Sequence, residues 1–195
     1  NSEIVARNCD HLLALVNNNL NLARIESGQL AIELKPENVS DLLDGVVSTM
    51  QIMAEEKGLK LRLLKDARLP AALSTDALRL REILINLLGN AIKFPESGEV
   101  ALAASWNEGE LKITVRDTGI GIAPENLTRI FDKFASLGDV ATHSSGKIKF
   151  KGGGPGLGLA IAKGFIEAHG GGVWAESLGC GEKTPPGSTF HIMVP

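Results

Sequence analysis

Four short blocks in the second half of the chain carry residue types that suit nucleotide binding. In chain order they are residues 86–91 (NLLGNA), 117–121 (DTGIG), 131–134 (FDKF) and 152–159 (GGGPGLGL). A carboxylate can accept a hydrogen bond from a base, an amide oxygen can bind a hard cation, and glycine-rich backbone can surround phosphates. Each block alone is weak evidence, but together and in this order they indicate a pocket for a magnesium–nucleotide complex.

The first block lies on a helix that the pattern predicts over about residues 77–94. Glu82, Asn86, Asn90 and Lys93 are spaced by four, four and three residues, so they share one helix face. Asparagine is unfavourable inside a helix, so two of them one turn apart favour a metal and phosphate face. An asparagine oxygen suits Mg²⁺, and a lysine can meet phosphate as a point charge. A solvated helix face is the structural alternative.

The second block follows an apolar strand predicted over residues 111–115. The carboxylate of Asp117 accepts hydrogen bonds only, so it favours the exocyclic amino group of adenine over the carbonyl of guanine. Gly119 and Gly121 let the backbone approach a base closely. The alternative is an ordinary turn in which Asp117 caps its own backbone.

The glycine-rich block precedes an apolar helix predicted over residues 156–168. Loop amides and the positive end of that helix can make an anion site. The block is not a Walker A loop, because no Gly-Lys-Ser/Thr follows it. It is not a GxGxxG fingerprint either, because its glycines have a different spacing. A flexible linker is the alternative. Lys147, Lys149 and Lys151, just upstream, can screen phosphate charge or simply form a solvated basic loop.

The order of the predicted helices and strands that position these blocks indicates an α+β two-layer sandwich, in which a mixed sheet packs on helices, with an additional N-terminal helix. The predicted helices are residues 1–30, a helix capped by Ser40 and ended near Gly58, residues 77–94 capped by Asp76, residues 124–134, and residues 156–168. The predicted strands are residues 59–63, 100–105, 111–115, 173–177 and 189–194. Phe131 and Phe134 are most simply core anchors of the short helix, and residues 135–154 read as a loop.

Composition narrows the function classes. The chain has 195 residues, a formal net charge of −3 and a pI near 5.8, so we expect no nucleic-acid partner. Aromatic residues make up 4%, which disfavours base-stacking platforms. Cys9 and Cys180 have no CxxC partner, and reduced cytosolic thiols are the default. We expect a cytoplasmic domain excised from a longer parent, whose membrane attachment the sequence leaves open.

In their order, the blocks resemble the N, G1, F and G2 boxes of the sensor histidine kinases of two-component systems. That family's catalytic domain has the Bergerat ATP-binding fold, shared with gyrase, mismatch-repair and heat-shock chaperone ATPases. The resemblance covers nearly the whole chain. It implies Asn90 as the Mg²⁺ ligand, Asn86 as a supporting amide and Lys93 as a phosphate contact.

The resemblance also implies the nucleotide contacts outside that helix. Asp117 would recognise adenine, and Gly119 and Gly121 would shape the pocket. Residues 187–190 (GSTF) resemble the last box, in which Thr189 would lie behind the adenine near Asp117. The phosphate side would be lined by Gly154, Gly156, Leu157 and Gly158, and a lid would run over about residues 135–151.

By the same resemblance, residues 1–33 look like the second helix of an incomplete dimerisation hairpin, and residues 36–195 like the catalytic domain. The implied function is to bind Mg–ATP and transfer its γ-phosphate to a histidine on a dimerisation helix of the same or a partner protomer. A response regulator receiver domain would then take the phosphate, and the parent would be a homodimer. The phosphoacceptor box itself is absent, since none of the four histidines has its context; they are His11, His143, His169 and His191.

Two departures from the family pattern keep other functions open. Pro155 stands where the family usually has a threonine or serine, and Glu96 where a small hydroxyl residue is commoner. A catalytically degenerate nucleotide-binding module is therefore one alternative, although Asn90 and Asp117 count against it. The other is an ATPase or an anti-sigma-type serine kinase. The ATPases place a glutamate base at the position of Asn86, an amide that is a poor base, and the helix of residues 1–30 disfavours the anti-sigma type.

Overall fold

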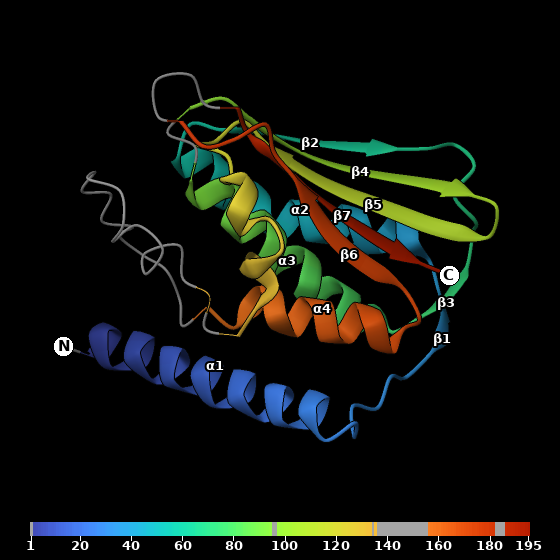
Figure 1. The fold of residues 1–195 in the computed structure, drawn as a ribbon, viewed down its shortest axis with the longest axis horizontal. Helices are drawn as coiled ribbons and strands as arrows, with labels where there is room; N and C mark the ends of the chain where they lie inside the picture. Colours follow the sequence, from blue (N-terminus) through green and yellow to red (C-terminus); the bar gives the residue numbers. More distant parts are fainter. Residues whose placement is uncertain (1, 95–96, 134, 136–155, 182–185) are drawn as a thin grey trace.

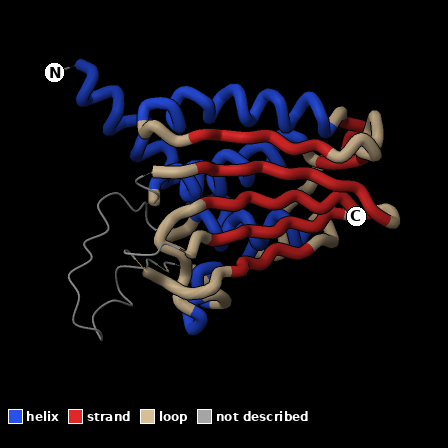
Figure 2. Tube along the Cα trace, turned by 90° about the horizontal axis from the view of Figure 1, so that it is seen from above, coloured by secondary structure: helices blue, strands red, loops and turns tan. Residues whose placement is uncertain are grey.

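The protein folds as two layers, with helices against one face of a sheet. The computed structural model describes residues 2–94, 97–133, 135, 156–181 and 186–195. Figure 1 shows α2, α3 and α4 on one side of the sheet, with α1 running beside α4. Figure 2, turned by 90°, shows the other face of the sheet without a helix over it. The predicted α+β sandwich with a mixed sheet and an N-terminal helix is confirmed.

The central sheet has the order β2-β4-β5-β7-β6, in which β2 is parallel to β4 and the other pairs are antiparallel. Its strands are β2 (Lys60–Lys65), β4 (Glu99–Asn107), β5 (Glu110–Asp117), β6 (Gly172–Glu176) and β7 (Ser188–Val194). Glu108 and Gly109 join β4 to β5 with φ angles of 52° and 89°. A two-residue turn with both φ angles positive matches the right-handed twist of a hairpin.

Alternation along the strands directs one set of side chains toward the helices. On β5, residues 111, 113, 115 and 117 are buried and the intervening Lys112 and Arg116 are exposed. The helices that cover this face are α2 (Val39–Glu56), α3 (Ala77–Lys93) and α4 (Gly158–Ala168). Their apolar stripes form the core together with the inward residues of β4, β5 and β7.

The helix caps agree only partly with the sequence. Asp76 caps α3 as predicted, since its Oδ1 accepts a hydrogen bond from the Arg79 N–H at 3.1 Å. Ser40 as the cap of α2 was wrong by two residues. Asn38 holds that position and accepts from the Asp41 N–H at 3.2 Å, while the Ser40 hydroxyl accepts from Lys65 Nζ. Both residue types cap helices well, so the local sequence does not choose between them.

Three further elements differ from the predictions. The helix predicted over residues 124–134 is instead two 3₁₀ turns, η1 (Pro124–Asn126) and η2 (Arg129–Phe131). Two strands that were not predicted, β1 (Lys35–Glu37) and β3 (Leu73–Thr75), pair antiparallel in a small separate sheet. Phe131 is buried, as expected of a core anchor, and packs edge-on against Phe190 at 6.3 Å between ring centroids. The other expected anchor, Phe134, lies outside the described residues.

The N-terminal helix α1 (Ser2–Glu26) touches the rest of the domain near its C-terminal end. Leu22 is buried, and Ile25 packs against α4 at Gly164, where an added Cβ would lie 2.7 Å from Ile25 Cδ1. Glu26 forms an ion pair with Lys133 beyond η2. On the described part of α1, Leu13, Val16 and Leu20 are exposed. No helix in the described ranges combines the length and apolarity needed to cross a membrane.

Candidate nucleotide-binding site

The predicted site residues gather at one end of the molecule. Strand β5 and helix α3 end there, and helix α4 begins there (Figure 1). A hydrogen bond joins the segments that follow α3 and β5, because Thr118 Oγ1 accepts from the Glu99 N–H at 3.1 Å. The first residue of β4 and the turn that follows Asp117 are therefore fixed relative to each other.

Asp117 presents a buried carboxylate at the end of β5. The residue is only 5% exposed, and its Oδ1 accepts a hydrogen bond from the Gly119 N–H at 2.8 Å. The hydroxyl of Ser188 donates to Oδ2. Burial raises the pKa of Asp117, and the hydrogen bonds from Ser188 and Gly119 oppose that rise. Each oxygen keeps a free lone pair, so the carboxylate can still accept a hydrogen bond from an amino group of a base.

The strand register corrects one predicted contact. Asp117 lies opposite Ser188 on β7, whereas Thr189 lies opposite Arg116. Neighbouring residues on a strand point to opposite faces, so Thr189 shares the face of exposed Arg116 and Ser188 shares the face of Asp117. The residue beside Asp117 is therefore Ser188. The sequence showed two adjacent hydroxyl residues, and only the register between distant strands distinguishes them.

Glycines allow the backbone around Asp117 to close up. Gly121 has a φ of +78°, and a Cβ there would lie 2.1 Å from the carbonyl oxygen of Gly179. Gly187 has a φ of +72°, and a Cβ there would lie 2.3 Å from the carbonyl oxygen of Asp117. The Gly119 carbonyl accepts from the Gly187 N–H at 2.9 Å. Any side chain at Gly121 or Gly187 would push these segments apart.

Ser177 is a residue of the candidate site that the sequence did not predict. Its Oγ accepts from the Ile122 N–H at 3.0 Å and lies 2.9 Å and 2.7 Å from the carbonyl oxygens of Gly179 and Gly187. One hydroxyl thus links the turn after β5 to the segments after β6 and before β7. A serine after a strand carries no local signal for such a role.

The asparagine face of α3 meets the start of α4 directly. A Cβ on Gly158, the first residue of α4, would lie 2.4 Å from Asn86 Oδ1. Asn86 Nδ2 is buried and has no hydrogen-bond partner among the described residues. A buried donor without a partner is costly, and an anionic ligand at the N-terminus of α4 would supply the acceptor. This pairing fits a phosphate group here, with Asn90 half-buried and Lys93 exposed one turn further along α3.

Two residues that precede α4 are also placed. Gly156 has a φ of +69°, and the side chain of Leu157 is buried in the core, so only its backbone is available to a ligand. The remaining expectations for this block lie outside the described residues. They concern Gly154, Pro155, the three upstream lysines and the lid over residues 135–151, of which the structure describes residue 135 alone.

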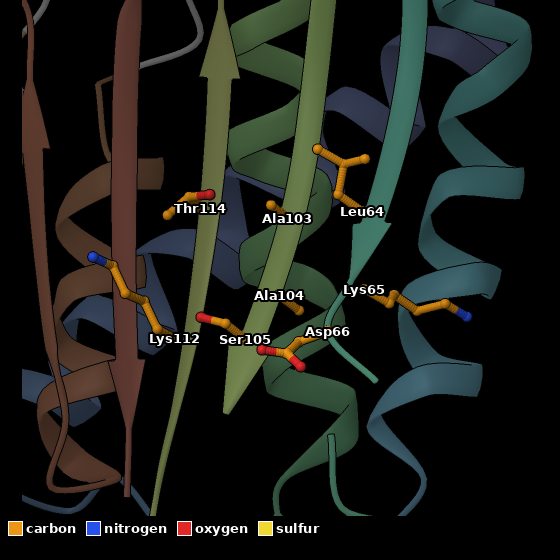
Figure 3. A pocket seen from close by; sticks show the side chains of 8 residues that line it. All are labelled: Leu64, Lys65, Asp66, Ala103, Ala104, Ser105, Lys112 and Thr114. Atoms are coloured by element: carbon orange, nitrogen blue, oxygen red, sulfur yellow. The ribbon is translucent and has the colours of Figure 1, made fainter. Parts of the chain in front are cut away.

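An open hollow of about 300 Å³ lies elsewhere, on the face of the sheet without helices. Figure 3 shows side chains from the ends of β2 and β4 and from β5 around it. Its lining residues are Leu64, Lys65, Asp66, Ala103, Ala104, Ser105, Lys112 and Thr114. None of the predicted nucleotide ligands is among them, so this hollow is separate from the candidate site.

Comparison with known proteins gives the family of the chain. Residues 75–195 match the family model of histidine kinase-, DNA gyrase B- and HSP90-like ATPases. The chain is 38% identical over 190 residues to the circadian input-output histidine kinase CikA of Synechococcus elongatus, covering 95% of this chain and 23% of that protein. It therefore spans about a quarter of the length of this relative.

Two solved structures are also similar. One is full-length ShkA in complex with AMPPNP, with a TM-score of 0.81 and 35% identity, covering all of this chain and 38% of that one. The other, histidine kinase ThkA in complex with the response regulator TrrA, has a TM-score of 0.67 and 20% identity, covering 94% and 48%. The chain belongs to the family of histidine kinase-, DNA gyrase B- and HSP90-like ATPases, and within it the chain is homologous to the catalytic domains of two-component sensor histidine kinases.

Proposed function

We propose that this chain binds Mg–ATP at the end of β5 and donates the γ-phosphate to a histidine on a dimerisation domain. The contact between Asn86 and Gly158 carries the proposal, because it joins the asparagine face of α3 to the N-terminus of α4. At this junction the buried Nδ2 of Asn86 has no hydrogen-bond acceptor among the described residues. A phosphate oxygen there would satisfy the amide and also meet the positive end of a helix dipole.

Each residue then has a defined task. Asp117 accepts from the exocyclic amino group of adenine, held in orientation by Ser188 and Gly119. Asn90 offers its amide oxygen to Mg²⁺, and Lys93 offers a mobile cation to the phosphates. When bound, Mg²⁺ neutralises charge on the phosphate oxygens. The backbone of Gly156, Leu157 and Gly158 lies at the phosphate side.

The side chains favour transfer to another protein over hydrolysis. Asn86 occupies the helix position at which a carboxylate would have to activate water, and an amide cannot take that proton. Its Oδ1 and Nδ2 instead face the start of α4. The domain's contribution to phosphoryl transfer is therefore positioning and charge neutralisation.

The acceptor and the onward relay belong to the whole parent protein. ThkA was solved with a response regulator, and we propose a receiver domain as the final acceptor for the parent of this chain as well. The exposed residues Leu13, Val16 and Leu20 of α1 are consistent with a helical partner in a homodimer.

A transfer assay in trans tests this function. The chain would be incubated with Mg²⁺ and γ-labelled ATP, together with a separately purified dimerisation domain that carries a histidine. We expect acid-labile label on that domain, and no transfer from Asn90→Ala or when the acceptor histidine is replaced. Release of inorganic phosphate without protein labelling would instead favour an ATPase. Nucleotide binding with neither labelling nor phosphate release would favour the catalytically degenerate module, and absence of nucleotide binding would contradict the proposal.

A further inference from the structure

Lys57 reaches from the end of one helix to the end of another. It is the C-cap residue of α2, and its Nζ donates to the carbonyl oxygens of Ile92 at 3.0 Å and Lys93 at 2.7 Å. The last four carbonyl groups of an α-helix have no partner within the helix. Lys57 therefore satisfies two of those four groups at the end of α3 and places a positive charge at the negative end of its dipole.

The backbone that carries Lys57 is itself well fixed. The Lys57 and Leu59 N–H groups both donate to the Ala54 carbonyl, at 3.1 Å and 2.9 Å, and Gly58 turns the chain with a φ of +67°. Leu59 is buried in the core directly after this turn. The turn thus holds the Lys57 backbone in place while its side chain spans to α3.

The same turn also holds the far end of the segment that leaves α3. The Lys60 N–H donates to the Gly98 carbonyl at 3.1 Å, next to the start of β4. Glu99 in turn donates its N–H to Thr118, the residue after Asp117. The turn at residues 57–60 therefore fixes both ends of the connection between α3 and β4, and it links that connection to the carboxylate side of the site.

The residues at this end of α3 are those assigned to metal and phosphate. Asn90 and Lys93 lie in its last turn, which is the part of a helix most prone to fraying. We propose that Lys57 is a positioning residue for this metal and phosphate face: by binding the Ile92 and Lys93 carbonyls, it keeps the last turn of α3 formed so that Asn90 is presented to Mg²⁺. This inference rests on the function proposed above.

The test compares Mg²⁺ dependence in three variants. ADP affinity would be measured by calorimetry with and without Mg²⁺ in the parent chain, Lys57→Met, Lys57→Arg and Lys60→Met. Lys60→Met is the matched control, because it removes the same charge from the same turn and leaves the Lys60 backbone hydrogen bond. We expect the gain in ADP affinity on adding Mg²⁺ to be about tenfold smaller in Lys57→Met than in the parent, while the affinity without Mg²⁺ changes little. Lys57→Arg should restore most of the gain.

Hydrogen exchange gives a second readout without ligand. Amides of residues 90–93 should exchange about tenfold faster in Lys57→Met, while those of residues 83–87, in the middle of α3, keep the rate of the parent. If Lys57→Met does not fold, Lys57→Gln takes its place, since it removes the charge but keeps a polar side chain.

The outcomes separate this inference from the proposed function. If the parent binds Mg–ADP and Lys57→Met shows the same Mg²⁺ dependence as Lys60→Met, the positioning role is overturned and the proposed function stands. An equal loss of affinity with and without Mg²⁺ also overturns it, because Lys57 would then only stabilise the fold. If the parent itself shows no Mg²⁺-dependent nucleotide binding, both proposals fail.

Discussion

At the scale of single residues, Asp117 is the residue that we propose recognises the base. Its carboxylate is buried, yet it is met by donors from two different segments, the hydroxyl of Ser188 and the N–H of Gly119. A buried carboxylate is costly unless it is hydrogen-bonded. The buried carboxylate therefore lowers the stability of the folded state, and it leaves a hydrogen-bond acceptor available at the end of β5.

Replacing Asp117 should remove this cost together with the binding. We expect Asp117→Asn to lose adenine-nucleotide binding, yet to gain stability relative to the parent as the pH rises above about 4. Burial raises the pKa of Asp117, so the folded state binds this proton more tightly than the unfolded state does. The free energy of unfolding of the parent therefore falls as pH rises through the folded pKa, and the variant lacks that fall. Urea unfolding at successive pH values measures the difference.

Glu110→Gln is the matched control, since Glu110 is exposed on the same strand. It removes one carboxylate from β5 without touching the buried one. Identical pH dependence of unfolding in the parent and in Asp117→Asn would show that no buried charge is present at Asp117.

The neighbouring hydroxyl residues on β7 allow a second prediction. Ser188→Ala leaves Asp117 Oδ2 without its donor, so the free energy of unfolding should fall by about 1–3 kcal/mol and ADP affinity by about tenfold. Thr189→Val keeps the shape of a residue on the other face and should change stability by less than about 0.5 kcal/mol. Urea unfolding and calorimetry give both quantities. A larger effect at Thr189 than at Ser188 would restore the contact expected from the sequence.

The residues of the candidate site show which features can be predicted from the sequence and which cannot. Asn86, Asn90 and Asp117 could be chosen from residue type and spacing, because a helix face and a strand end are local features. Ser188 and Ser177 could not, because their partners lie far away in the sequence and depend on strand register. A shift of one residue exchanges the two faces of a strand, and nothing within residues 187–190 fixes that shift.

At the scale of elements, long periodic segments were predictable and short ones were not. The helix α3 has both an apolar stripe and an aspartate cap, and the β4–β5 hairpin has alternation and a glycine turn. β1 and β3 have three residues each and exist only through pairing with each other. The segment of residues 124–134, which contains the 3₁₀ turns η1 and η2, begins with a proline and ends with two phenylalanines at helical spacing, a pattern that is also typical of one short α-helix.

The junction of α3 and α4 gives the prediction at this scale. Gly158→Ala places a Cβ 2.4 Å from Asn86 Oδ1, so the amide must move away from the start of α4. We expect ATP affinity to fall at least about tenfold while adenosine affinity is retained, because only the phosphate side is disturbed. Calorimetry with both ligands measures the split.

Gly89→Ala is the matched control for Gly158→Ala. Gly89 lies within α3, and the nearest atom to an added Cβ is Met50 Cε at 4.0 Å. Alanine should raise helix stability there by about 0.5–1 kcal/mol. Unchanged ATP affinity in Gly158→Ala would show that the contact with Asn86 is not part of the phosphate site.

At the scale of the whole molecule, the described contacts of α1 with the domain lie near the C-terminal end of the helix. Ile25 packs at Gly164, Glu26 pairs with Lys133, and the segment after α1 is anchored where the Glu33 N–H donates to Asp76 Oδ2 at 3.1 Å. Asp76 also caps α3. The docking of α1 is thus connected to the same helix that carries the proposed metal and phosphate face.

A single methyl group should loosen this docking. Gly164→Ala would bring a Cβ within 2.7 Å and 2.8 Å of Ile25 Cδ1 and Cγ2, so Ile25 must shift. Spin labels on the two free cysteines, Cys9 and Cys180, report the position of α1. We expect a broader distance distribution in Gly164→Ala than in Gly89→Ala. The same distribution in both variants would mean that Gly164 is not needed for the docking of α1.

Binding of Mg²⁺ and nucleotide is the central claim, and calorimetry tests it most directly. ADP and ATP would be titrated into the parent chain, Asp117→Asn and Asn90→Ala, each with and without Mg²⁺. We predict that the parent binds, that Asp117→Asn loses binding under both conditions, and that Asn90→Ala still binds but no longer responds to Mg²⁺. No binding by the parent, or variants that bind as the parent does, would contradict the site described at the end of β5.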